Sequence, residues 1–169
     1  MISRFACLIL LVMVLITGSA AAEETLRGMV KAVHDGDTVV LVGRGTGRLT
    51  VRLYGIDAPE TSKPDRPGQP YSSQARRVLM YKVLGHEVTV RLREYDQYGR
   101  GVGVLLLDGR DINAEMVVEG QAWAYRIFLD GPYASTYIRL EEQARRLRRG
   151  LWRDPNPKPP WEFRQGRKR

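Results

Sequence analysis

The chain has 169 residues, carries 27 Lys and Arg against 19 Asp and Glu, and has a formal net charge of +8. Its single cysteine, Cys7, lies in an apolar N-terminal segment, so the rest of the chain can form neither a disulfide nor a thiolate metal site. The positive charge favours attraction to polyanions such as nucleic acid or anionic lipid, and it is equally compatible with a role in solubility alone.

Residues 1–22 have the pattern of a secretory signal peptide. Arg4 provides the positive charge, residues 5–16 form an apolar run, and small residues at 18–22 resemble a cleavage site. The run is shorter than the roughly 20 apolar residues of a transmembrane helix, although an uncleaved segment would tether the protein to a membrane. We expect cleavage after Ala22 and a secreted or periplasmic monomer without stable membrane association. The remainder is long enough for one domain with a hydrophobic core.

Three strands are expected at the start of the mature chain. Residues 29–33 and 38–42 are β-branched and apolar, and an Asp-Gly turn between them is typical of a hairpin. Residues 49–53 alternate apolar and polar side chains, as in a half-buried strand. In an antiparallel meander the end of the third strand returns to the start of the second. Asp37 and Asp57 can therefore be neighbours although they are far apart in the sequence.

A helix and two further strands are expected downstream. The helix begins at Ser72 or Ser73, whose hydroxyl can cap it, and ends before Gly85. The strands follow at 87–93, where apolar and polar residues alternate, and at 101–107, which is apolar on both faces.

The C-terminal part of the domain is expected to be helical. Asn113 is expected to cap a short helix, and the apolar spacing over 133–151 predicts a longer one. Five strands with one helix between the third and fourth have the order of an OB-fold barrel. We therefore expect an α+β, mainly β fold, with a five-stranded OB-fold barrel and two C-terminal helices at residues 23–152. A Pro-rich basic tail follows at 153–169.

Acidic side chains at two turns could hold a metal ion. Asp37 and Asp57 are short carboxylates at turn positions, and the proline that follows Ala58 keeps the chain extended at the Ala58 carbonyl. Hard cations such as Ca²⁺ take several oxygen ligands of these kinds. Asp35 is more simply interpreted as part of the Asp-Gly turn, and Asp37 could share that structural role. The lack of a Cys or His cluster in the sequence argues against zinc.

Two arginines and one glutamate complete the candidate site. Arg52 and Arg100 each stand at a strand end beside a glycine turn, and a guanidinium presents a planar fork of donors that matches phosphate oxygens. Arg52 could instead form an ion pair of small value with Asp57 or Glu60. Glu60 could accept a proton from a water molecule near the cation, or it could serve only as a helix or turn cap.

Two tyrosines are candidates for contact with a nucleotide. Tyr98 and Tyr125 could stack on a base, since stacking of a base on an aromatic side chain contributes about 1–3 kcal/mol and tolerates any base. Aromatic residues near the mouth of a barrel are also common in the core, so a structural role for both tyrosines stays open.

Three motifs together resemble the staphylococcal nuclease (thermonuclease) family in their order and spacing. They are DGDT at 35–38, RLYGIDAPET at 52–61 and DQYGRG at 96–101. The resemblance extends over 30–152, and it implies an OB-fold nuclease that uses Ca²⁺ to hydrolyse DNA and RNA and leaves 3′-phosphate products. Sequence specificity should be low, because such a site addresses the phosphate backbone rather than the base edges.

The resemblance also assigns roles to individual residues. Asp37, Asp57 and the carbonyl of Ala58 would bind Ca²⁺, Arg52 and Arg100 would hold the phosphate, Glu60 would be the general base, and Tyr98 and Tyr125 would lie on the substrate side. Ala58 replaces the threonine of better-known members, which matters little where only a backbone oxygen is needed. The alternative is a noncatalytic OB-fold module that binds nucleic acid or protein, although the complete charged set argues against it.

Overall fold

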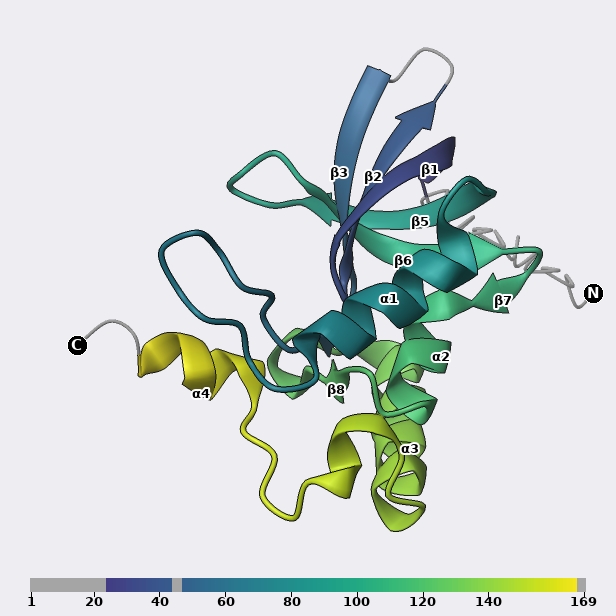
Figure 1. The fold of residues 1–169 in the computed structure, drawn as a ribbon. Coiled ribbons are helices and arrows are strands. Elements are labelled where there is room, and N and C mark those ends of the chain that lie inside the picture. The colour runs from purple at the N-terminus through teal and green to yellow at the C-terminus, as the bar shows by residue number, and fades with distance from the viewer. Residues whose placement is uncertain (1–23, 44–46, 167–169) are drawn as a thin grey trace, which may run out of the picture.

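The computed structural model describes residues 24–43 and 47–166, so the predicted signal peptide lies outside the described residues. The larger sheet has six strands in the order β3-β2-β1-β5-β6-β7. They are β1 (Thr25–Asp35), β2 (Thr38–Gly43), β3 (Gly47–Leu53), β5 (Glu87–Tyr95), β6 (Gly101–Leu107) and β7 (Arg110–Asp111). A parallel pairing of β3 with β6 closes the strands into a barrel (Figure 1). The predicted five-stranded barrel is confirmed, and β7 is a short addition.

Buried apolar side chains of the strands fill the barrel. Val30 and Val33 of β1 and Val88 and Val90 of β5 are buried, while the residues between them are more exposed. β6 is buried at most of its positions, as expected for a strand that is covered on both faces. Full burial of one such side chain contributes about 1.5–3 kcal/mol, so this set provides much of the stability of the barrel.

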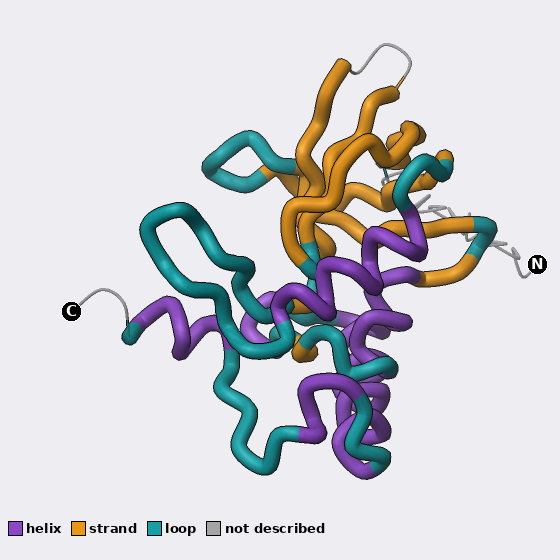
Figure 2. The backbone as a smooth tube through the Cα atoms, in the orientation of Figure 1, coloured by secondary structure: helices purple, strands orange, loops and turns teal. Residues whose placement is uncertain are grey.

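The helices pack at one end of the barrel, and Figure 2 shows strands and helices in largely separate parts of the molecule. They are α1 (Ser72–Val83), α2 (Ile112–Val118), α3 (Gly131–Arg146) and α4 (Pro160–Gln165), with two 3-10 turns, η1 (Arg126–Phe128) and η2 (Gly150–Arg153). α1 docks through Ala75, Leu79 and Val83, and α3 through Tyr137 and Ala144. In the part of the chain that the structure describes, no helix has the length and apolar character needed to cross a bilayer.

Two C-terminal segments lie beside the N-terminal half of the domain. A second small sheet pairs β4 (Ile56–Asp57) with β8 (Trp123–Ala124), so the chain around Asp57 lies against the helical region. The segment expected to be a basic tail also folds back, and its helix α4 lies near the long loop that precedes α1 (Figure 1).

The start of α1 differs from the sequence-based expectation. The residue before the helix is Tyr71, which has a φ of 67° and makes no side-chain capping bond. Ser72 is the first helical residue and is buried. The prediction that a serine caps this helix is therefore wrong, because the entry angle is set by the left-handed backbone at Tyr71. The predicted end is confirmed, since Gly85 follows with a φ of 78°.

Asn113 does not cap α2 as predicted. The N-cap is Asp111, whose carboxylate accepts a hydrogen bond from the Ala114 N–H at 2.9 Å. Asn113 is completely buried instead. Its side-chain oxygen accepts from the Leu105 N–H at 3.0 Å, and its amide nitrogen donates to the carbonyls of Tyr54 at 3.0 Å and Gly103 at 3.3 Å. One asparagine thus joins β6, the β3–β4 turn and α2.

Replacing Asn113 with alanine is expected to lower the free energy of unfolding by about 2–3 kcal/mol, because buried backbone groups lose their partners. Urea denaturation measures the change. The exposed Asn156 is a matched control, and its replacement with alanine should change stability by less than about 0.5 kcal/mol. Equal effects of the two substitutions would show that the Asn113 bonds are not important for the fold.

Candidate active site

The barrel topology brings the first two predicted motifs together. β2 and β3 pair in antiparallel register, with Thr38 opposite Arg52, and the Leu53 N–H donates to the Asp37 carbonyl at 2.8 Å. The chain then turns through Gly55 into β4, which contains Asp57. The start of β2 and the segment after β3 therefore meet at one edge of the barrel, as the meander predicted.

Two buried carboxylates lie at this edge. Asp37 is 2% exposed and Asp57 is 1% exposed. The terminal nitrogen Nη2 of Arg52 contacts both, at 2.8 Å from Asp57 Oδ1 and 3.4 Å from Asp37 Oδ2. The expectation that the two aspartates are neighbours is confirmed by this shared contact. The alternative role of Arg52 is also realised, since it forms an ion pair with Asp57, but with partners that are buried rather than at the surface.

The loop after β4 is held close to the β1–β2 hairpin. The Ala58 N–H donates to Asp37 Oδ2 at 3.0 Å, which fixes the Ala58 backbone beside that carboxylate. Gly36 makes this approach possible, because a Cβ there would lie 2.8 Å from the Cβ of Ala58 and 2.7 Å from that of Ala75. Asp35 accepts hydrogen bonds from the backbone N–H and hydroxyl of Thr61. Its structural interpretation is the one that the contacts support.

Glu60 lies on the same loop, and its backbone is fixed on both sides by Gln69. The Glu60 N–H donates to the side-chain oxygen of Gln69 at 3.3 Å, and the Gln69 N–H donates to the Glu60 carbonyl at 2.8 Å. The Glu60 carboxylate is partly exposed and accepts a hydrogen bond from Arg164 Nη1 at 2.6 Å. The Glu60 side chain therefore pairs with an arginine that also contacts Asp57, rather than capping a helix or a turn.

Arg100 is oriented by Asp96 in the β5–β6 turn. Arg100 Nε donates to Asp96 Oδ2 at 2.7 Å, and Asp96 Oδ1 accepts from the backbone N–H groups of Arg100 and Tyr98. The Arg100 guanidinium lies 5.4 Å from the centre of the Tyr98 ring. Asp96 therefore orients the Arg100 guanidinium through Nε rather than through its terminal nitrogens.

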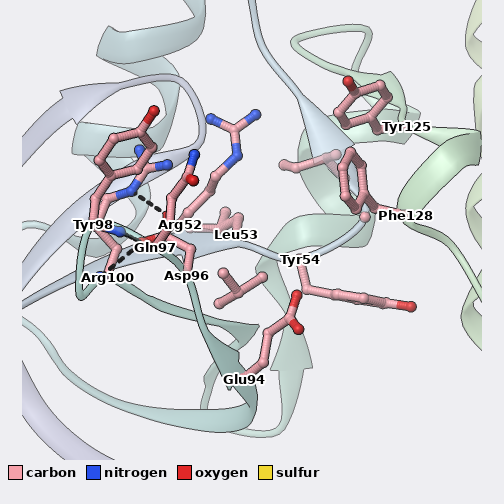
Figure 3. Close-up of a pocket in the computed structure, with 13 residues that line it drawn as sticks. Arg52, Leu53, Tyr54, Glu94, Asp96, Gln97, Tyr98, Arg100, Tyr125 and Phe128 are labelled. Atoms are coloured by element: carbon pink, nitrogen blue, oxygen red, sulfur yellow. Dashed lines mark hydrogen bonds and ion pairs between the residues drawn. The ribbon is translucent and has the colours of Figure 1, made fainter.

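Two adjoining cavities share these side chains. The more polar one has a volume of about 520 Å³ and contains Asp37, Ala58 and Glu60. Its neighbour, of about 380 Å³, is lined by Tyr54, Tyr125 and Phe128. Arg52, Tyr98 and Arg100 border both cavities. Figure 3 shows them on one side of the second cavity, with Tyr125 and Phe128 on the opposite side.

The two tyrosines lie at different depths. Tyr98 is 74% exposed, so a core role for it is wrong. Tyr125 is half-buried, and its ring stacks on Trp161 with 5.1 Å between centroids and 8° between planes. It also contacts Phe128 at 4.9 Å between centroids. Both tyrosines therefore border the cavity, but one face of Tyr125 is already covered by the chain itself.

Comparison with known proteins identifies the family of this chain. A family described as staphylococcal nuclease homologue matches residues 50–154. The chain belongs to the staphylococcal nuclease family. It is 42% identical over 160 residues to a micrococcal nuclease of Shigella flexneri, covering 89% of this chain and 87% of that protein. Protein ParB of Escherichia coli is 39% identical over 162 residues, which are 90% of this chain and 86% of the relative.

A third relative also covers the C-terminal segment. An uncharacterized endonuclease of Haemophilus influenzae is 32% identical over 168 residues, which are 99% of this chain and 89% of that protein. The family match at 50–154 begins after the Asp37 turn and ends before α4. The resemblance drawn from the three motifs is confirmed, together with the barrel fold that it implied.

The donor set of this family member fits a hard cation. Asp37 and Asp57 offer carboxylate oxygens beside the Ala58 backbone, and oxygen donors suit Ca²⁺ rather than zinc. Over residues 24–43 and 47–166, no three Asp, Glu, His or Cys side chains are grouped closely enough to hold an ion alone. Backbone, water or phosphate oxygens would therefore have to complete the coordination.

The electrostatics of the site combine buried acids with fixed cations. The charge of Asp37 is the main reason that the pKa of Arg52 is raised, and it outweighs burial, which acts in the opposite direction. Burial also raises the pKa of Asp57, although the hydrogen bonds from Arg164 oppose this shift. Asp57 is thus a buried carboxylate whose two ion-pair partners are arginines.

Three residues of the site carried no assigned role in the sequence analysis. Asp96 is the first residue of the DQYGRG motif, and its place in the same turn as Arg100 could have indicated that the two side chains interact. Gln69 lies in a proline-rich loop and gave no signal. Arg164 was counted only as part of the basic tail, yet it contacts Asp57 and Glu60 directly. Nothing in the local sequence indicates how far a tail folds back.

Proposed function

We propose that this protein is an exported, monomeric, Ca²⁺-dependent nuclease that hydrolyses DNA and RNA with low sequence specificity. The observation that carries the proposal is the pair of buried carboxylates, Asp37 and Asp57, bridged by Arg52 at one wall of a polar cavity that also contains Arg100. The nuclease names of the relatives from Shigella and Haemophilus support the same reaction class. Export is supported by the signal-peptide pattern of residues 1–22.

In the proposed reaction the arginines bind the scissile phosphate. The guanidinium groups of Arg52 and Arg100 donate hydrogen bonds to its nonbridging oxygens and stabilise the charge that develops when phosphorus becomes five-coordinate. Glu60 orients a water molecule and accepts its proton as the water attacks in line. The bond to the 5′ oxygen breaks and this oxygen takes up a proton from solvent water, which leaves a 3′-phosphate and a 5′-hydroxyl. Asp37, Asp57 and the Ala58 carbonyl would hold Ca²⁺, which supplies Lewis-acid and template effects when bound.

The aromatic cavity is suited to a base next to that phosphate. Tyr98 and Tyr125 stand on its two sides, and Arg52 and Arg100 face the polar cavity beyond it. Stacking uses the π-face that every base has, so it adds affinity without sequence selection. This arrangement supports low sequence specificity and the use of both DNA and RNA.

Digestion assays test the proposal. Plasmid DNA and a single-stranded RNA should both be degraded with Ca²⁺ and left intact when EGTA is present, and added Ca²⁺ should restore cleavage. The products should accept phosphate from a polynucleotide kinase without phosphatase treatment, because their 5′ ends are hydroxyls. Cleavage that is unchanged in EGTA would contradict the calcium dependence. Binding of nucleic acid without any cleavage would favour a noncatalytic OB-fold module.

Export is tested separately from activity. The N-terminal sequence of the protein recovered outside the cytoplasm should begin after Ala22. Recovery only in the membrane fraction, with residues 1–22 still attached, would show that the segment is a tether.

A further inference from the structure

The C-terminal segment places a third guanidinium, after those of Arg52 and Arg100, against acidic residues of the site. Arg164 of α4 forms a bidentate ion pair with Asp57, with Nη2 at 2.8 Å from Oδ2 and Nη1 at 3.1 Å from Oδ1. Nη1 also lies 2.6 Å from Oε1 of Glu60. Arg52 already contacts Asp57 Oδ1, so both oxygens of this carboxylate are occupied by arginine donors.

The segment that carries Arg164 is anchored to the domain at several points. Trp161 stacks on Tyr125 and packs edge-on against Trp123, with 5.5 Å between centroids. The side-chain amide of Gln69 donates to the Lys158 carbonyl at 2.5 Å while its oxygen accepts from Glu60. The residue that fixes the Glu60 backbone therefore also fixes the tail. Arg164 is delivered to the acids by a docked segment rather than by a loose end.

This position conflicts with cation binding. A hard cation must contact carboxylate oxygens directly. Arg164 donates to both oxygens of Asp57, so it competes for the same atoms, whereas Arg52 donates to Oδ1 alone. The pKa of Arg164 is raised: burial acts against this, but hydrogen bonding to Asp57 and the charge of Asp57 outweigh it. Arg164 therefore remains charged at every physiological pH. Arg164 also donates to Oε1 of Glu60, the residue proposed to accept a proton from water.

We propose that the C-terminal segment is an autoinhibitory strap, in which Arg164 competes with the divalent cation for Asp57 and Glu60 and Trp161 holds the segment on Tyr125. This inference rests on the proposed cation site. Binding of the cation requires the strap to withdraw, which also uncovers one face of Tyr125. If the withdrawn state is a tenth of the population, the apparent affinity for the cation falls tenfold.

Calorimetric titration with Ca²⁺ alone, without nucleic acid, tests the strap on the intact chain. Arg164→Ala is expected to lower the apparent Kd for Ca²⁺ by about tenfold. Trp161→Ala should also lower the apparent Kd, although it removes no charge, because the substitution weakens the stacking that anchors the segment on Tyr125. Arg153→Ala removes a positive charge from an exposed position of the same segment, and it should change the Kd by less than about twofold.

The outcomes separate this inference from the proposed function. Failure of both the wild type and Arg164→Ala to bind Ca²⁺ or to cleave DNA would overturn the cation site itself. A wild-type protein that binds and cleaves, with an Arg164→Ala variant of unchanged or weaker Ca²⁺ affinity, would overturn only the strap. Loss of cleavage by Arg164→Ala at saturating Ca²⁺, with circular dichroism of a folded protein, would make Arg164 a phosphate-binding residue instead.

Discussion

Replacing Arg52 with alanine is expected to lower kcat for DNA cleavage by about 10²–10³-fold, the usual cost of removing one donor that stabilises charge in a transition state. Arg52 stands at the end of β3, contacts both buried aspartates and borders both cavities. An ion pair and a phosphate site are therefore not exclusive roles. The carboxylates hold one nitrogen of the guanidinium, which leaves its other donors for the substrate.

Two further variants serve as controls for this result. Arg52→Lys keeps the charge but loses the planar fork, so it should recover only part of the activity. Arg48 is exposed on the same strand, and Arg48→Ala should retain wild-type activity. Urea denaturation of each variant shows whether lost activity reflects lost fold. Activity of Arg52→Ala within threefold of wild type would remove Arg52 from the reaction.

Asp57→Asn is expected to weaken Ca²⁺ binding by about 100-fold or more, because even residues that only support a metal ligand cost 10–100-fold when changed. The substitution keeps the size of the side chain and removes one of two carboxylates from a buried position. Cleavage at a fixed low Ca²⁺ concentration should fall by at least the same factor. Calorimetry and the rate of plasmid cleavage measure the two effects.

The control for Asp57 is a carboxylate outside the site. Asp65 is exposed in the loop before α1 and pairs with Arg66. Asp65→Asn changes the net charge equally, so it should leave both Ca²⁺ affinity and cleavage within about twofold of wild type. A similar loss in both variants would mean that general electrostatic attraction, rather than coordination by Asp57, governs cation binding.

The strands and turns of the barrel could be predicted because the sequence patterns that indicate them are local. Alternation of apolar and polar residues indicates a strand at 49–53 and at 87–93. The Asp-Gly turn and Gly85 likewise indicate the backbone conformation at their own positions. The meander then required Asp37 and Asp57 to approach each other, which the shared contact with Arg52 confirms. The register of β2 against β3 fixes that approach, and the register follows from which face is apolar.

The features that sequence analysis missed depend on contacts between distant segments. Asn113 looked like a helix cap, and only the closed barrel shows that it satisfies the backbone of β6 and the β3–β4 turn. Glu141 lies on the inner face of α3, where spacing alone would place an apolar residue. It is completely buried, accepts a hydrogen bond from the Ala124 N–H at 2.7 Å and pairs with Arg145.

Arg164 is the clearest case of a long-range contact. The tail composition, with its prolines and basic residues, is typical of a segment that extends into solvent. Trp161 gives it an apolar anchor, but the partner, Tyr125, is determined only once β8 and η1 are in place. A lone tryptophan in a basic tail was the available signal, and it does not specify which surface it contacts.

A crystal structure of the protein with Ca²⁺ and a phosphorothioate dinucleotide would show whether the two aspartates and the two arginines act on one phosphate. We expect one cation coordinated by the carboxylates of Asp37 and Asp57, with the substrate phosphate within hydrogen-bond distance of Arg52 and Arg100. A cation bound elsewhere, or a phosphate that contacts neither arginine, would contradict it.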